Sequence, residues 1–203
     1  MKNRRVPIVV ATSNTGKARE IAAALRGLPV RVLSLADLGI SAEYPETGST
    51  FARNARGKAA FYSGLSGHWT LAEDSGLAVD ALFGAPGIYS ARFSGPRATD
   101  SRNNRKLLRL LRGLPPAKRG ARFVCCMALA RNGRVVKQVT GRVRGRILDT
   151  GRGGSGFGYD PLFFYRRLGR TFGQVEPPVK NAISHRGRAL AKMSLFLPAI
   201  LEK

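Results

Sequence analysis

Two acidic residues stand side by side in a chain that has few of them. Glu73 and Asp74 lie within Ala72-Glu73-Asp74-Ser75-Gly76-Leu77, whereas the whole chain has 12 Asp+Glu against 35 Lys+Arg. Neighbouring carboxylates at the end of a strand suit a hard divalent cation, which prefers oxygen ligands and often bridges to phosphate groups. The alternative is an ordinary turn, because Asp-Ser-Gly is favourable turn chemistry. This segment alone leaves both interpretations open.

A candidate phosphate site lies where the first apolar run meets the first helical pattern. The backbone N–H groups and the positive dipole end of a helix N-terminus attract phosphate. A glycine lets the backbone approach closely, and a lysine adds a positive charge. The alternative is a capped helix start with a surface lysine. The segment reads Thr12, Ser13, Asn14, Thr15, Gly16 and Lys17.

A second pair of charged residues brackets the start of the next helical pattern. Glu46 precedes it as a candidate metal ligand, and Lys58 lies on the same predicted helix face as Asn54, four residues earlier. Lys58 would add a second phosphate contact. Each of the two charged residues, taken by itself, is better explained as a solvated surface charge.

The candidate base-binding residues lie in the last third of the chain. Phe157 sits between two glycines, where it could stack on a nucleobase, and Asp160 could accept hydrogen bonds from purine N–H groups. A Gly-rich turn that buries a core aromatic is the alternative. His185 and Arg186 open the last helical pattern just after Lys180, and an arginine can donate to a carbonyl or phosphate oxygen.

The elements that position these residues follow from the hydrophobic pattern. Residues 7–12 and 30–35 read as strands around a helix at 16–28, which predicts a parallel β-α-β opening. Asn132-Gly133 is a strong type I′ turn signal and joins predicted strands at 121–131 and 134–148. Further helices are expected at 50–63 and 100–111 and from about Ser184 onward, and a strand at 161–165. This mixture predicts an α/β fold with a mixed sheet.

Composition narrows the class of protein further. The chain has 203 residues, of which 43% are hydrophobic, and a net charge of +23. Such a charge indicates polyanionic partners, either nucleic acid or phosphate-bearing substrates. The two cysteines, Cys125 and Cys126, are adjacent in an apolar run and indicate neither a disulfide framework nor a zinc site. The longest apolar run is too short to span a membrane, so we expect a soluble cytoplasmic protein.

Taken together, these segments resemble the inosine/xanthosine triphosphate pyrophosphatase family, which hydrolyses ITP, dITP and XTP. The resemblance runs in one order from Val9 to about Leu197. It includes Gly84-Ala-Pro-Gly-Ile-Tyr-Ser-Ala-Arg in addition to the segments described above. It implies a two-lobed single domain over residues 1–203, with a long mixed β-sheet flanked by helices and a substrate cleft between the lobes. It also implies a homodimer, a requirement for Mg²⁺, and products that are the nucleoside monophosphate and pyrophosphate.

The resemblance assigns roles residue by residue. Asp74 would be the general base that activates water for attack at the α-phosphorus, and Glu46, Asp74 and Glu73 would hold the metal. The triphosphate would bind to residues 12–17, with Lys17 foremost, and to Lys58 and Ser75. The base would bind to a cluster that comprises Phe157, Gly158, Tyr159, Asp160, Lys180, His185 and Arg186.

This chain departs from the family pattern in a few places. Glu73 stands where many members have Asp, Ser13 where Gly is common, and Gln174 where Glu is frequent. The charge of +23 is unusual for the family and leaves room for weak nucleic-acid binding, although nucleic acid is not required as a partner. Two other functions stay open: a nucleic-acid-binding module, and a related house-cleaning pyrophosphatase for modified pyrimidine nucleotides.

Overall fold

The computed structural model describes residues 5–201 and contains a mixed sheet whose strand order is β2-β1-β3-β4-β5-β6-β7. β1 pairs in parallel with both β2 and β3, whereas β6 pairs antiparallel with both β5 and β7. The predicted parallel β-α-β opening is therefore confirmed, as is the α/β fold class. The strands are β1 (Val6–Ala11), β2 (Val30–Ser34), β3 (Trp69–Val79), β4 (Gly120–Arg131), β5 (Arg134–Ile147), β6 (Phe163–Tyr165) and β7 (Arg170–Thr171).

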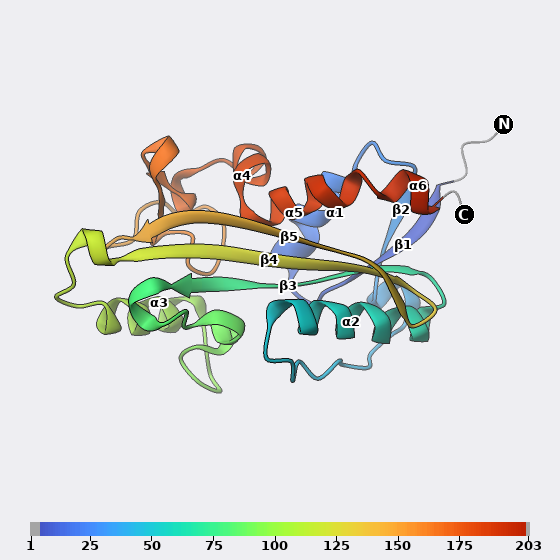
Figure 1. Cartoon of the computed structure of the whole chain (residues 1–203), viewed down its shortest axis with the longest axis horizontal. Coiled ribbons are helices and arrows are strands. Elements are labelled where there is room, and N and C mark those ends of the chain that lie inside the picture. The colour runs from blue at the N-terminus through green and yellow to red at the C-terminus, as the bar shows by residue number, and fades with distance from the viewer. Residues whose placement is uncertain (1–4, 202–203) are drawn as a thin grey trace. The chain divides into compact units, whose positions relative to one another are not determined.

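Helices accompany the sheet (Figure 1), six of them α-helices within the described residues, and side chains cap the first three. Asn14, Thr50 and Thr99 each accept a hydrogen bond from a backbone N–H in the first turn, which satisfies one of the free donors there. The helices are α1 (Thr15–Leu25), α2 (Phe51–Ser66), α3 (Asp100–Leu110), α4 (Pro177–Ile183), α5 (His185–Ser194) and α6 (Leu197–Leu201). The predicted last helix is thus divided, because Leu197 belongs to α6 and not to α5.

The β4–β5 hairpin agrees with its prediction. Asn132 and Gly133 both have positive φ angles, 50° and 76°, as a type I′ turn requires. Along β5 the side chains alternate, with Val139, Val143 and Ile147 buried and the even-numbered arginines exposed.

The chain divides into two compact units, each assembled from separated segments. The first unit contains residues 5–74, 125–141 and 186–201, and the second contains residues 75–124 and 142–185. The expectation of a single catalytic domain across residues 1–203 stays a prediction.

In the first unit the core forms where α1 and α5 lie on the sheet, with α2 on the opposite face (Figure 1). Ile21 and Leu25 of α1 meet Leu190 and Met193 of α5 over strand residues that include Leu71.

The second unit has its own core, in which α3 contributes Leu107 and Leu111. They pack with aromatic residues from β4, from β6 and from the segment directly after β7, and the rings of Phe123, Phe163 and Phe172 are in mutual contact. No helix within residues 5–201 has the length and apolar character needed to cross a membrane.

Candidate active site

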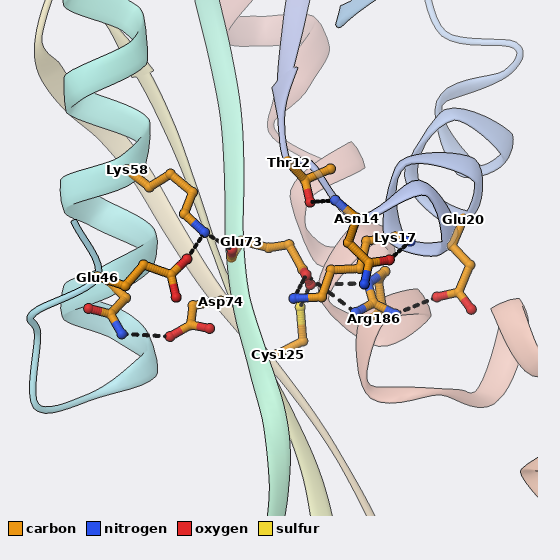
Figure 2. A network of polar contacts seen from close by, with 11 residues as sticks. Thr12, Asn14, Lys17, Glu20, Glu46, Lys58, Glu73, Asp74, Cys125 and Arg186 are labelled. Carbon is orange, nitrogen blue, oxygen red and sulfur yellow. Dashed lines mark hydrogen bonds and ion pairs between the residues drawn. The ribbon is translucent and has the colours of Figure 1, made fainter. Parts of the chain in front are cut away.

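The two neighbouring carboxylates do not lie at a strand end. β3 continues without interruption from Trp69 to Val79, so Glu73 and Asp74 sit in mid-strand, 1% and 5% exposed. Adjacent side chains on a strand point to opposite faces. Figure 2 shows Asp74 directed toward α2, and Glu73 directed toward α1 and Arg186. The two carboxylates therefore do not share one face of the strand, and the metal contact expected of Glu73 stays a prediction.

Asp74 lies against α2 and the segment that precedes it. Asn54 Nδ2 donates to Asp74 Oδ2 over 2.8 Å, and Asn54 Oδ1 accepts from the backbone N–H of Gly48. A Cβ at residue 48 would collide with the Asn54 amide oxygen, so only glycine allows this approach. Asn54 therefore fixes both the Asp74 carboxylate and the 46–49 turn, a role that the sequence analysis did not assign.

Glu46 and Lys58 complete this side of β3. Lys58 forms an ion pair with Glu46, and its Nζ lies 3.5 Å from the backbone oxygen of Glu73 (Figure 2). The structure thus brings together Glu46, Lys58 and Asp74, three residues for which the sequence predicted metal or phosphate contacts.

The pKa of Asp74 is raised to about 6, chiefly by burial, and the negative charge of Glu46 acts in the same direction. The hydrogen bond from Asn54 and the positive charges of Lys17 and Lys58 act in the opposite direction. A carboxylate with a pKa near neutrality is suited to take a proton from water, because it is deprotonated at neutral pH and still holds a proton strongly.

Glu73 is the centre of a buried charge cluster on the other face. Lys17 Nζ lies 2.7 Å from Glu73 Oε1, Arg186 Nε donates to Oε2 over 3.0 Å, and the Cys125 thiol donates to the same oxygen. Arg186 also pairs with Glu20 of α1 (Figure 2). Burial alone would raise the pKa of Glu73, but Arg186 and Lys17 outweigh it and hold that pKa well below its ordinary value.

The donor set therefore fits a divalent metal on one face of β3 only. Mg²⁺ is commonly held by one or two carboxylates together with substrate phosphates, and Glu46 and Asp74 provide two. Within residues 5–201 no group of three or more His, Cys, Asp or Glu residues is arranged to hold a metal ion by itself. Glu73 fits poorly as a ligand, because both of its oxygens are bonded to cationic side chains.

The predicted phosphate segment surrounds the start of α1. Asn14 is the N-cap, its side chain accepts from the Lys17 N–H, and its own N–H donates to the Thr12 hydroxyl. Ser13, Asn14 and Thr15 are exposed, and Gly16 and Lys17 are half-buried in the first turn. The Lys17 side chain forms an ion pair with Glu73. Its contact with phosphate stays a prediction.

In the second unit the predicted base-binding residues form a cluster of their own. Asp160 Oδ2 accepts from the Phe157 N–H over 2.9 Å and from Lys180 Nζ over 2.5 Å. The same ammonium group lies 4.7 Å from the centre of the Phe157 ring. Tyr159 is buried and donates to the backbone oxygen of Ser90. These contacts fix the loop, whereas its contact with a nucleobase is untested.

The remaining predicted residues have clear local positions. Ser75 follows Asp74 on β3 and is half-buried. The His185 ring stacks on Phe123 with 4.7 Å between centroids and 10° between planes. Arg186, the next residue, belongs to the Glu73 cluster of the first unit.

Two residues of α3 hold the loop that follows Phe157. The Gly158 N–H donates to Asp100 Oδ2 over 2.6 Å, and Asn104 Nδ2 donates to the Gly158 oxygen over 3.0 Å. Gly158 has a φ of +62°, a conformation that favours glycine. Both polar backbone groups of Gly158 are therefore held from the first turns of α3. The sequence analysis missed this pair, since the residues lie more than 50 positions from the loop.

The raised pKa of Asp74 predicts a pH dependence of stability. Because the folded protein binds this proton more tightly than the unfolded chain, the stability from this group is fully present below about pH 4 and is lost as the pH rises through about 6. Asp74→Asn removes the titration. In EDTA, we expect the free energy of unfolding of the variant to rise relative to that of the wild type by up to about 3 kcal/mol between pH 4 and pH 7.5, measured with urea. An unchanged difference between the two proteins across this range would contradict the assignment.

Comparisons with known proteins cover nearly the whole chain. The sequence profile of the Ham1 family matches residues 8–196. A dITP/XTP pyrophosphatase of Geobacter sulfurreducens is 51% identical over 184 residues, which cover 91% of this chain and 92% of the relative. Another, from Listeria innocua, is 44% identical over 97% of both chains. The solved structure of a HAM1 protein from Coxiella burnetii superposes with a TM-score of 0.86 at 37% identity, covering 96% of this chain and 99% of that one.

Proposed function

This chain belongs to the Ham1 family, and we propose that it hydrolyses non-standard purine nucleoside triphosphates, dITP, XTP and ITP, to the monophosphate and pyrophosphate. The observation that carries the proposal is the environment of Asp74: a buried carboxylate with a raised pKa, oriented by Asn54 and lying on the same side of β3 as Glu46 and Lys58. We place the reaction in the cytoplasm and expect the enzyme to act as a homodimer.

In this proposal Asp74 takes the proton from the water that attacks the α-phosphorus. Its pKa allows it to be ionised at neutral pH, and the Asn54 hydrogen bond keeps one oxygen oriented while the other stays available. Lys17 and Lys58, now paired with Glu73 and Glu46, would exchange part of these contacts for phosphate oxygens.

Mg²⁺ would be held by Glu46 and Asp74, and when bound it neutralises charge on the phosphates. The two carboxylates leave room for substrate oxygens in the coordination sphere, as magnesium sites generally do. We assign Glu73 a different part: it compensates Arg186 and Lys17 and so keeps both cations in place inside the protein.

Residues of the second unit would bind the purine base. Phe157 offers a ring for stacking, and Lys180 and His185 offer donors for a 6-oxo group, with Asp160 an acceptor for ring N–H groups. Adenine presents an amino donor at position 6, and donors that face each other without acceptors are costly. ATP should therefore be a poor substrate.

A nucleotide panel tests the proposal. We expect rapid pyrophosphate release from ITP, dITP and XTP, slow release from GTP and ATP, and loss of activity in EDTA that Mg²⁺ restores. Preferential cleavage of dUTP or of modified pyrimidine nucleotides would instead support the alternative function, a related pyrophosphatase that acts on modified pyrimidine nucleotides. Release of orthophosphate alone would exclude both enzymes.

The contacts from α3 give a prediction for substrate affinity. Asn104→Ala removes the hydrogen bond to the Gly158 oxygen and so loosens the loop beside Phe157. We expect the KM for ITP to rise about three- to tenfold with little change in kcat. The cost in stability should be small, because Asn104 Oδ1 is buried without a hydrogen-bond partner inside the 5–201 range. Arg109→Ala, at an exposed position of α3 outside the cavity beside Phe157, should leave both constants unchanged.

A further inference from the structure

The exposed arginines of the second unit are not used by the proposed reaction. Three of them, Arg144, Arg146 and Arg166, line one groove of about 630 Å³. No acidic residue lines the groove, and its one aromatic residue is Phe164. The remaining lining residues are small or apolar: Pro116, Ala117, Gly120 and Gly145.

The charge in this groove is uncompensated. Over the described range of the chain, Arg144 and Arg166 make no hydrogen bond or ion pair, and Arg146 only lies over the Phe164 ring, 4.8 Å from its centre. Other arginines of the same unit are paired: Arg119 binds Asp149 and three backbone oxygens, and Arg122 binds Asp80. Like charges held close together repel, so an anionic partner would relieve this cost.

The arrangement of the groove indicates which anion fits. Arg144 and Arg146 are alternate residues on the exposed face of β5 (Figure 1), so their Cα atoms lie about 7 Å apart along the strand. Arg166 follows β6 on the same groove, beside an aromatic ring that already stacks with a guanidinium group. A row of arginines with an aromatic platform is the arrangement that binds a phosphate chain carrying unpaired bases.

We propose that this groove binds single-stranded nucleic acid without sequence preference, independently of nucleotide hydrolysis. A single nucleotide substrate needs no such extended row, whereas a strand can place successive phosphates along it. This function also gives a use to part of the net charge of +23, which the proposed reaction leaves unexplained.

The experiment compares two triple variants that lose the same charge from the same unit. One carries Arg144→Gln, Arg146→Gln and Arg166→Gln. The matched control carries Arg97→Gln, Arg109→Gln and Arg112→Gln, which replaces three exposed arginines of the second unit that line neither this groove nor the cavity beside Phe157. Binding of a fluorescein-labelled oligothymidylate is followed by fluorescence anisotropy over a series of salt concentrations, and ITP cleavage is measured in parallel.

We expect the groove variant to bind at least about tenfold more weakly and the slope of log K against log salt to shrink by about 2, since each phosphate contact on a single strand contributes roughly 0.7. The control variant should keep the wild-type slope, and both variants should cleave ITP normally. Equal losses in both variants would show that only net charge matters, and wild-type binding by the groove variant would also overturn the proposal. A particle mass in sedimentation that differs between the groove variant and the wild type would overturn it too, because the groove would then be an interface between copies of the chain.

Discussion

Asp74→Asn should abolish most of the activity toward ITP, with kcat reduced about 10²–10⁴-fold. The substitution keeps the size of the side chain, and the amide oxygen of residue 74 can still accept from Asn54 Nδ2. What it loses is the ability to take a proton from water, together with one of the two carboxylates that would hold the metal. Steady-state kinetics with saturating Mg²⁺ measures the change.

The control for this variant is Asp37→Asn, an exposed aspartate of the same unit whose carboxylate binds only the Ser34 turn. It should leave the rate unchanged. Because Asp74→Asn is expected to be more stable than the wild type at neutral pH, unfolding would not account for the lost activity. A variant that retained more than a tenth of the wild-type kcat would exclude Asp74 as the general base.

Glu73→Gln should cause the largest loss of stability of any single substitution that we predict. The side chain is fully buried and neutralises Arg186 and Lys17, and removing one partner of a buried ion pair costs about 3–5 kcal/mol. Arg186 keeps Glu20 as a partner, and Lys17 is partly exposed, so we expect a value near the lower end, about 3 kcal/mol.

Urea unfolding at neutral pH measures this loss as a lower midpoint with an unchanged slope. Glu43→Gln, an exposed carboxylate in the same unit, is the matched control and should lie within about 0.5 kcal/mol of the wild type. If the free energies of unfolding of Glu73→Gln and the control differed by less than about 1 kcal/mol, the stability of the buried cluster would not depend on this carboxylate.

Local signals in the sequence predicted most of the elements correctly. The helix expected at residues 50–63 forms as α2, with Thr50 as its cap, and Asn132-Gly133 forms the predicted turn, because both depend on the chemistry of a few neighbouring residues. The alternation of valines and arginines on β5 was also predictable from its period of two.

The course of β3 was not predictable from the same local signals. Asp74-Ser75-Gly76 favours a turn when it is read alone, yet the strand continues to Val79 between β1 and β4 in the sheet. Sheet pairing with distant segments decides the outcome, as it does for β-structure in general. This one difference places Glu73 on the face opposite Asp74, where its carboxylate pairs with Lys17 and Arg186.

Contacts between distant residues were also beyond the sequence. Glu20 and Arg186 are separated by 166 positions, and Cys125 donates to a carboxylate 52 positions earlier. No spacing rule relates such residues, so only the fold brings them together. The sequence allowed the candidate residues of the site to be recognised by their type, but it did not indicate their hydrogen-bond and ion-pair partners.

The most direct test of the account is hydrolysis of ITP with Mg²⁺ in water enriched in oxygen-18, with the products separated and weighed by mass spectrometry. If Asp74 activates a water for attack at the α-phosphorus, one labelled oxygen appears in inosine monophosphate and none in pyrophosphate. Label in pyrophosphate or in orthophosphate would mean that the water attacks another phosphorus, and the mechanism proposed for Asp74 would be wrong.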